Sequence, residues 1–83
     1  MTKEEYNGWK NRATWNVSMC LNNDQSIYEG AVEFMKDYKG ISPYRSFMRT
    51  CGLQGQRTPD KILWVSQILD FEALNEMMWE LRG

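Results

Sequence analysis

Apolar positions recur along most of the chain with the period of an α-helix. The clearest stripe runs from residue 27 to residue 38, with spacings of one, three and four positions. Its members are Ile27, Tyr28, Ala31, Val32, Met35 and Tyr38. Asn23 or Asp24 is the expected N-cap, and Gly40 is the expected left-handed C-cap. Gly30 costs this helix about 1 kcal/mol relative to alanine, which predicts a close neighbour at that point.

Two further helices are marked by start and stop signals. Ser42-Pro43 predicts an N-cap followed by proline at the first helical position, and Gly52 predicts the end of that helix. Its apolar face consists of Tyr44, Phe47, Met48 and Cys51. Asp70 is the expected N-cap of the last helix. The inward stripe of that helix consists of Phe71, Leu74, Met77, Met78 and Leu81.

Two segments fit more than one structure. Residues 15–21 alternate like a strand but also fit a short helix capped by Thr14, and we favour the helix because no partner strand is evident. Thr58-Pro59 repeats the cap-plus-proline signal, but residues 61–65 fit either a helical turn or an extended run. The pattern therefore predicts a mostly all-α bundle of about four short helices, with a flexible lead-in over residues 1–8.

Composition agrees with one small folded domain over residues 1–83. The chain is 42% hydrophobic and 25% charged, which is typical of a globular protein with a single core. No apolar run approaches the roughly 20 residues of a membrane span, and the first residues lack the apolar core of a signal peptide. We therefore expect no membrane association and a cytoplasmic protein whose Cys20 and Cys51 are buried reduced thiols; a disulfide between them is the minor alternative.

Enzymatic chemistry has little support in the sequence. There is no histidine, so the usual general base at neutral pH is missing, and neither cysteine stands beside an activating group. The two cysteines cannot complete a zinc site, and no phosphate-binding loop is present. Carboxylates recur four positions apart at Glu72, Glu76 and Glu80, a spacing typical of a solvated helix face. We expect no catalytic residues, no cofactor and no metal.

One stretch of the chain is basic. Residues 36–57 contain five basic side chains and only one acidic side chain, Asp37. The basic residues are Lys36, Lys39, Arg45, Arg49 and Arg57. Arg45 and Arg49 share a helix face, which favours a small nucleic-acid-binding module as one hypothesis. A net charge of −1 for the whole chain weakens that hypothesis and leaves ordinary solvated charges as the alternative.

Tryptophan carries the competing hypothesis of protein binding. Trp79 falls off the apolar stripe of the last helix beside two methionines, a combination that fits a contact with a partner protein or a homodimer. Packing of Trp79 under another helix is the alternative, and Trp15 and Trp64 are expected in the core. The asparagines between residues 7 and 23 are expected to cap helices and close turns. The residues given such a structural role are Trp9, Thr14, Trp15, Asn16, Asn23 and Asp24.

The opening of the chain resembles a known family. The run Tyr-Asn-Gly-Trp-Lys-Asn-Arg-Ala-Thr-Trp-Asn-Val over residues 6–17 is similar to the first motif of a family of small uncharacterised proteins from bacteriophages, plasmids and bacterial genomes. Residues 21–24 and Tyr28 continue the likeness, and residues 74–77 and 80–81 resemble the family's end. The likeness covers about half of the chain, and Trp79 stands where a charged residue is expected.

This resemblance implies no catalytic residues. Small proteins of phages and mobile elements often bind and block host defence machinery, so the setting implies an anti-CRISPR-like inhibitor that occupies the surface of a host protein. A non-enzymatic protein-binding role is therefore the leading hypothesis, with the basic stretch and Trp79 as the expected contact residues. Nucleic-acid binding is the alternative, and an enzyme comes third.

Overall fold

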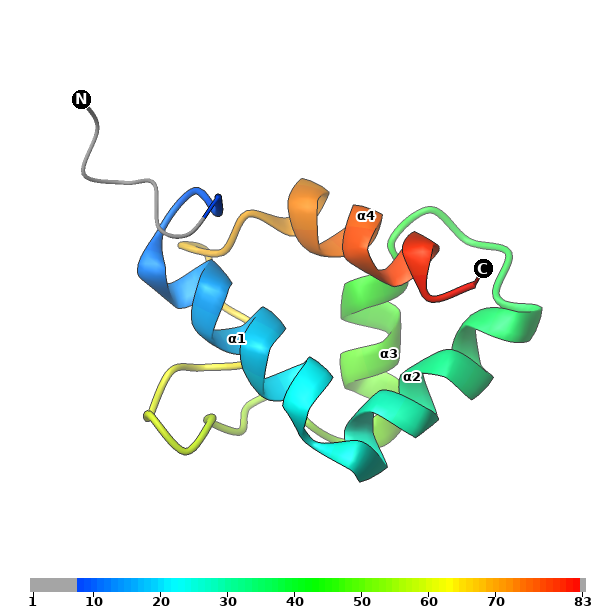
Figure 1. Ribbon diagram of the computed structural model, residues 1–83, viewed down its shortest axis with the longest axis horizontal. Coiled ribbons are helices and arrows are strands. Elements are labelled where there is room, and N and C mark those ends of the chain that lie inside the picture. The colour runs from blue at the N-terminus through cyan, green and yellow to red at the C-terminus, as the bar shows by residue number, and fades with distance from the viewer. Residues whose placement is uncertain (1–7, 83) are drawn as a thin grey trace.

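The computed structural model describes residues 8–82 and contains four α-helices in that range (Figure 1). They are α1 (Arg12–Asn23), α2 (Gln25–Asp37), α3 (Pro43–Cys51) and α4 (Phe71–Glu80). The segment between α3 and α4 is not helical and carries an isolated antiparallel bridge between Arg57 and Leu63. The fold is thus the small all-α bundle that the sequence predicts. Residues 1–7 of the predicted lead-in lie outside the described part of the chain.

Helices α1 and α2 meet at a single residue. The backbone N–H of Asp24 closes α1 on the carbonyl of Cys20, and its carboxylate accepts the amide hydrogen of Ile27 at 3.1 Å, as an N-cap of α2. Residues 15–21 are helical, as favoured above. The N-cap of α1 is Asn11 rather than Thr14, because Asn11 Oδ1 accepts from the Thr14 amide at 2.8 Å. Thr14 therefore lies inside the first turn, and its hydroxyl is available for other contacts.

The end of α2 differs from the prediction. The helix ends at Asp37, before Gly40, and Gly40 does not have the positive φ of a left-handed cap. A Cβ at Gly40 would instead overlap the hydroxyl of Tyr38. That hydroxyl accepts from the Ser42 amide at 3.0 Å and lies 3.2 Å from the Ser46 hydroxyl. Gly40 therefore makes room for the ring that ties the α2–α3 loop to α3.

Helix α3 begins at Pro43 and ends at Cys51, with Gly52 as its C-cap, as predicted. Gly52 has a φ of 81°, and its amide donates to the carbonyl of Met48. Ser42 occupies the N-cap position but its side chain makes no capping bond. The bond comes from another helix, because Asn75 Oδ1 in α4 accepts the Tyr44 amide at 3.0 Å. The first turn of α3 is thereby fixed to α4.

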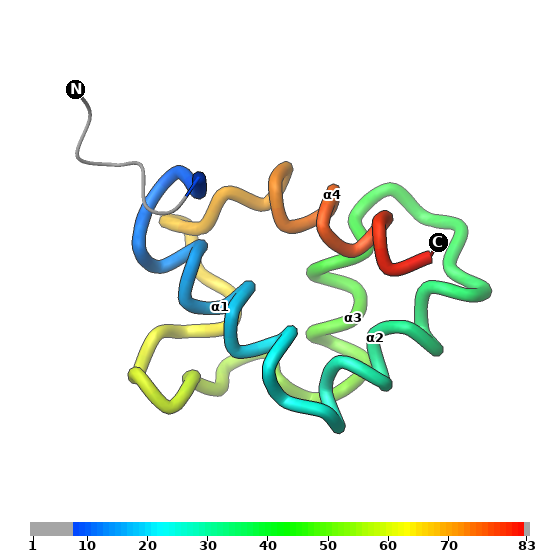
Figure 2. The backbone as a smooth tube through the Cα atoms, in the orientation of Figure 1, coloured from blue at the N-terminus to red at the C-terminus, as the bar shows by residue number. Residues whose placement is uncertain are grey.

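The buried apolar side chains form one cluster that all four helices and the 52–70 segment share. Figure 2 shows the backbone of these elements, with the 52–70 segment running from the end of α3 to the start of α4. Its members are Ala13, Val17, Leu21, Ala31, Met35, Tyr44, Phe47, Met48, Trp64, Leu69, Leu74 and Met78. Asp70 caps α4 as predicted, its Oδ1 accepting from the Ala73 amide at 3.2 Å. The three glutamates of α4 are exposed, as a solvated face requires.

Several burial predictions need correction. Trp64 is in the core as expected, but Trp15 is only half-buried. The cysteines are free thiols but not buried ones: Cys20 is half-buried and Cys51 is exposed, because Cys51 is the last residue of α3 and lies past its buried face. Gly30 faces the ring of Phe47, yet an added Cβ would stand 3.6 Å from it, an ordinary contact rather than a close approach.

Candidate functional site

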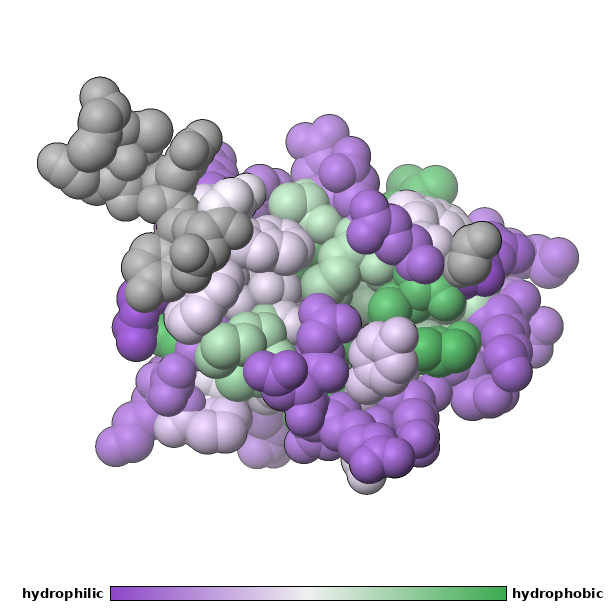
Figure 3. Space-filling view, in the orientation of Figure 1, coloured by the Kyte–Doolittle hydropathy of each residue, from purple (hydrophilic) through white to green (hydrophobic). Residues whose placement is uncertain are grey.

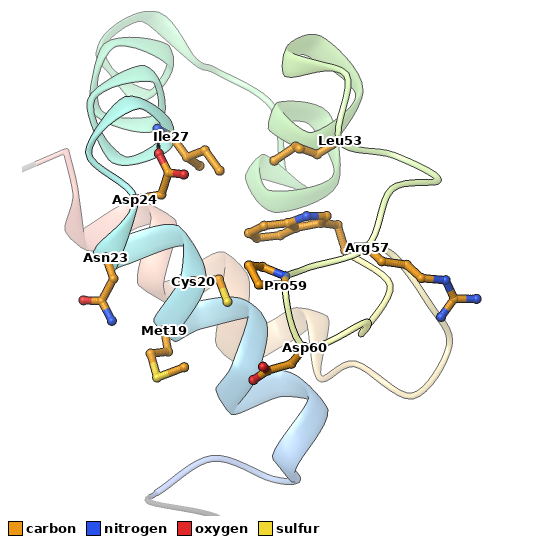
Figure 4. A pocket seen from close by; sticks show the side chains of 10 residues that line it. Met19, Cys20, Asn23, Asp24, Ile27, Leu53, Arg57, Pro59 and Asp60 are labelled. Atoms are coloured by element: carbon orange, nitrogen blue, oxygen red, sulfur yellow. Dashed lines mark hydrogen bonds between the residues drawn. The ribbon is translucent and has the colours of Figure 1, made fainter.

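The described part of the chain contains a concave groove of about 550 Å³, which we call the Trp64 groove (Figure 4). It lies between the second half of α1, the first turn of α2 and the segment that follows α3. Its lining residues are Met19, Cys20, Asn23, Asp24, Ile27, Leu53, Arg57, Pro59, Asp60 and Trp64. A volume of this size falls in the range of ligand-binding pockets in proteins, roughly 300–1,000 Å³.

The centre of the groove is apolar and its edges are charged. Ile27 and Leu53 point toward one another (Figure 4), and the buried indole of Trp64 belongs to the same lining. The carboxylates of Asp24 and Asp60 stand at the edge, and both residues are exposed. No pattern in the sequence predicts this site, because its residues come from two helices and an irregular segment that no spacing brings together.

A buried asparagine holds one wall of the groove in place. Asn16 Nδ2 donates to Asp60 Oδ2 at 2.6 Å, and Asn16 Oδ1 accepts from the Thr58 hydroxyl at 2.8 Å. The same hydroxyl accepts from the Ile62 amide at 3.2 Å. The Thr58-Pro59 signal therefore begins no helix; Thr58 is instead buried in a tight turn in which Lys61 has a positive φ of 70°.

A second group of hydrogen bonds joins the start of α1 to the end of the same segment. Asn11 Nδ2 donates to the Ile68 carbonyl at 2.7 Å. The Thr14 hydroxyl donates to Asn11 Oδ1 at 2.7 Å and accepts from the Asp70 amide at 3.0 Å. Asn11, Thr14 and Asn16 thus fasten the long 52–70 segment to α1. Asn23 is exposed at the groove edge, and its side chain points away from Ile27 and Leu53 (Figure 4).

The thiol in the groove is a weak nucleophile at neutral pH. Burial, and then the negative charge of Asp60, raise the pKa of Cys20 above its ordinary value. Burial likewise raises the pKa of Cys51. Because the thiolate is the reactive form, both shifts keep these cysteines protonated.

Trp79 lies at the opposite end of α4 from Asp70, against the start of the α2–α3 loop. Its ring centroid is 5.8 Å from that of Tyr38, and the guanidinium of Arg82 lies 5.8 Å from the Trp79 ring centroid. Trp79 is 36% exposed, and Ile41, which lies in the α2–α3 loop, is 90% exposed. We call Tyr38, Ile41, Trp79 and Arg82 the Trp79 surface. On the face seen in Figure 3, strongly apolar surface gathers where α2 and α4 meet.

The basic residues of the predicted site are spread over α2, the α2–α3 loop, α3 and the following segment. Lys36 forms an ion pair with Glu33 at 2.9 Å, and Arg45 lies over the Phe71 ring at 5.1 Å from its centroid. Arg57 Nη1 donates to the Lys61 carbonyl at 2.9 Å. Lys39 and Arg49 are exposed on the loop and on α3. Of the predicted binding residues, only Arg57 lines the Trp64 groove.

Trp9 lines a smaller cavity of about 270 Å³. It lies between Trp9 and α4 and is lined by Gly8, Ala73, Glu76, Met77 and Glu80. Trp9 is half-buried and packs against the core. Within residues 8–82 no three histidine, cysteine or acidic side chains are grouped to hold a metal ion, and no helix of that range is long and apolar enough to cross a membrane.

Comparison with known proteins places this fold in one sequence family. The model of a family of unknown function (DUF7249) matches residues 2–83. No curated protein and no solved structure matches the chain. The match extends through the middle of the chain, where the motifs of the opening and the end gave no resemblance.

Proposed function

The chain belongs to this family of unknown function, and we propose that it is a non-enzymatic protein of a phage or mobile element that acts by binding a host protein. The target we propose is a component of the host's antiphage defence in the host cytoplasm, which the protein inhibits by covering its surface, as anti-CRISPR proteins do. The resemblance of residues 6–17 to a family from phages and plasmids supports the setting.

The observation that carries protein binding is the Trp79 surface. Ile41 is the most exposed large apolar side chain in the described part of the chain, and it lies in the loop that Tyr38 joins to Trp79. Exposed apolar side chains that stand together mark contact sites, and tryptophan is enriched among residues that dominate binding energy. Arg82 lies over the Trp79 ring, and the exposed Lys39 is in the same loop as Ile41, so the surface fits an apolar patch with an acidic rim.

The thiol chemistry supports a role without catalysis. The two free thiols have raised pKa values, and the chain has no histidine to deprotonate them. The row of glutamates on α4 is exposed, which is the ordinary position of solubilising charges.

Nucleic-acid binding remains the second candidate, carried by Arg45 and Arg49 on the exposed side of α3. We favour protein binding because Lys36, Arg45 and Arg57 are already engaged with groups of the chain itself. Each of these contacts costs energy to exchange for a phosphate contact.

Affinity capture from nuclease-treated bacterial host lysate tests the proposal. We expect a specific partner whose capture falls about tenfold with Trp79→Ala and with Ile41→Ser. Ile68→Ser is the matched control, because Ile68 is 61% exposed but lies at the other end of α4, and it should capture the partner normally. Equal capture by all three variants would show that the Trp79 surface is not the contact.

A gel shift distinguishes the second candidate. If the protein bound DNA or RNA, low salt would give a shift that weakens steeply as salt rises and that Arg45→Ala with Arg49→Ala abolishes. We expect no shift at low salt.

A further inference from the structure

We propose that the Trp64 groove is a second binding site, which takes a peptide segment of a partner protein in which a lysine or arginine stands next to an apolar residue. This site is separate from the Trp79 surface and does not depend on it. The groove lies at the α1–α2 junction, whereas the Trp79 surface lies where the end of α2 and the end of α4 meet (Figures 1 and 4).

The apolar centre of the groove is the reason to expect an apolar residue in the bound peptide. The buried indole of Trp64 is part of its lining, and the side chains of Ile27 and Leu53 face one another (Figure 4). Both flanking side chains are only half-buried, so an incoming aliphatic or aromatic side chain would remove apolar surface from water on both partners. A groove of about 550 Å³ has room for at least one such side chain.

The charges at the edge of the groove are the reason to expect a lysine or arginine in the bound peptide. Asp24 Oδ1 accepts from the Ile27 amide and Asp60 Oδ2 accepts from Asn16, so both carboxylates are fixed in position by the fold. The one cation of the lining, Arg57, donates to the Lys61 carbonyl, and its guanidinium points away from the groove (Figure 4). The edge therefore carries two ordered negative charges, which complement the charge of a lysine or arginine. The aliphatic part of that side chain would lie along the apolar centre of the groove.

The open edge favours a peptide over a small molecule. A small ligand is held by burying most of its surface. Here five of the lining residues are exposed: Asn23, Asp24, Arg57, Pro59 and Asp60. A segment that lies across the groove can insert one side chain and leave its backbone in water. The two carboxylates then select its charge.

The experiment uses a library of random dodecapeptides displayed on a carrier and selected on the full-length protein. We expect enriched peptides in which a lysine or arginine adjoins an apolar residue. A synthetic peptide of the enriched sequence should shift the Trp64 indole N–H signal in ¹H–¹⁵N NMR spectra, which Trp64→Phe identifies. Its binding should weaken as NaCl rises from about 50 to about 500 mM, because the ion pairs are exposed to solvent.

A charge-removing double variant is the decisive comparison. Asp24→Asn with Asp60→Asn keeps a capping oxygen for α2 and an acceptor for Asn16 while removing both charges. We expect about fivefold weaker peptide binding, with unchanged circular dichroism and thermal unfolding. The matched control, Asp37→Asn with Glu72→Gln, changes the net charge equally at exposed positions outside the groove and should bind normally.

Three results would overturn the proposal. One is that the selection enriches acidic peptides or enriches no peptide at all. Another is equal binding by the double variant and the wild type. The third is binding of phenethylammonium alone as tightly as the peptide, which would assign the groove to a small organic cation. None of these results bears on Trp79→Ala or Ile41→Ser, so failure here and failure of the proposed function remain distinguishable.

Discussion

Helices α1 and α3 hold their neighbours by different means. The buried face of α1 includes three polar side chains, Thr14, Asn16 and Ser18, whereas the buried face of α3 is formed by Pro43, Tyr44, Phe47 and Met48. Thr14 and Asn16 bond to groups more than forty positions away in the sequence. Helix α3 contacts α2 and α4 chiefly through apolar side chains.

The two helices therefore have different roles: α1 determines where the 52–70 segment lies, and α3 contributes to the stability of the whole domain. Hydrogen bonds are directional, so Asn11, Thr14 and Asn16 determine where the irregular 52–70 segment passes over α1. Apolar burial is non-directional and supplies most of the free energy of folding. The asparagine-rich motif therefore specifies the groove wall, and α3 supplies stability to the whole domain.

The largest effect is expected from a cavity on the α3 side. Met48 is fully buried in the core cluster, so Met48→Ala should lower the free energy of unfolding by about 2–5 kcal/mol. Met48→Leu conserves volume and should cost less than about 1.5 kcal/mol. Urea denaturation measures both. A cost below about 1 kcal/mol for the alanine variant would mean that α3 is not held by packing.

A smaller but more localised effect is expected on the α1 side. Asn16→Ala removes the partners of Thr58 and Asp60 and should cost about 1–3 kcal/mol. Hydrogen exchange should quicken first at the amides of residues 58–62, because Asn16 fastens that turn to α1. Asn23→Ala is the control and should change stability by less than about 0.5 kcal/mol, since Asn23 is exposed. Uniform loss of protection across the protein would contradict a local role for Asn16.

The sequence predicted the helices better than their ends. The stripe of α2 and the cap-plus-proline start of α3 are local signals, and both helices formed where expected. Thr14 was misread because Asn11 caps α1 and leaves the Thr14 hydroxyl to accept from the Asp70 amide, and Gly40 because the Tyr38 ring lies beside it. A local pattern cannot reveal a partner that the fold supplies.

The candidate sites show the same limit. Trp79 stood out because it breaks the stripe of its own helix, and it is partly exposed. The Trp64 groove had no such signal, since Trp64, Leu53 and Ile27 read as core or loop residues until the 52–70 segment is placed against α1. Asn16 was recognised as structural, but its bonds span 42 and 44 positions and could not be read from spacing.

The smallest expected effect concerns the one buried hydroxyl of α3. The Tyr44 hydroxyl donates to the Trp64 carbonyl at 2.6 Å, and burial raises its pKa far above the ordinary value of 10.0. The folded state therefore keeps this proton at a pH where the unfolded chain releases it. The stability from this group is complete below pH 10 and is lost as the pH rises further, by up to about 1.4 kcal/mol per pH unit.

Tyr44→Phe tests this alkaline loss. The variant should be about 1 kcal/mol less stable at pH 8, because the Trp64 carbonyl loses its donor. Above pH 10 its stability should fall less steeply than that of the wild type. Both proteins keep the two thiols, whose raised pKa values begin to lower stability from about pH 9. The difference between the two urea-denaturation curves thus isolates Tyr44, and Tyr28→Phe, at an exposed position, should follow the wild type. Parallel curves for Tyr44→Phe and the wild type would mean that the Tyr44 hydroxyl ionises equally in the folded and unfolded chain, and coincident curves would mean that its hydrogen bond adds nothing to the packing of α3.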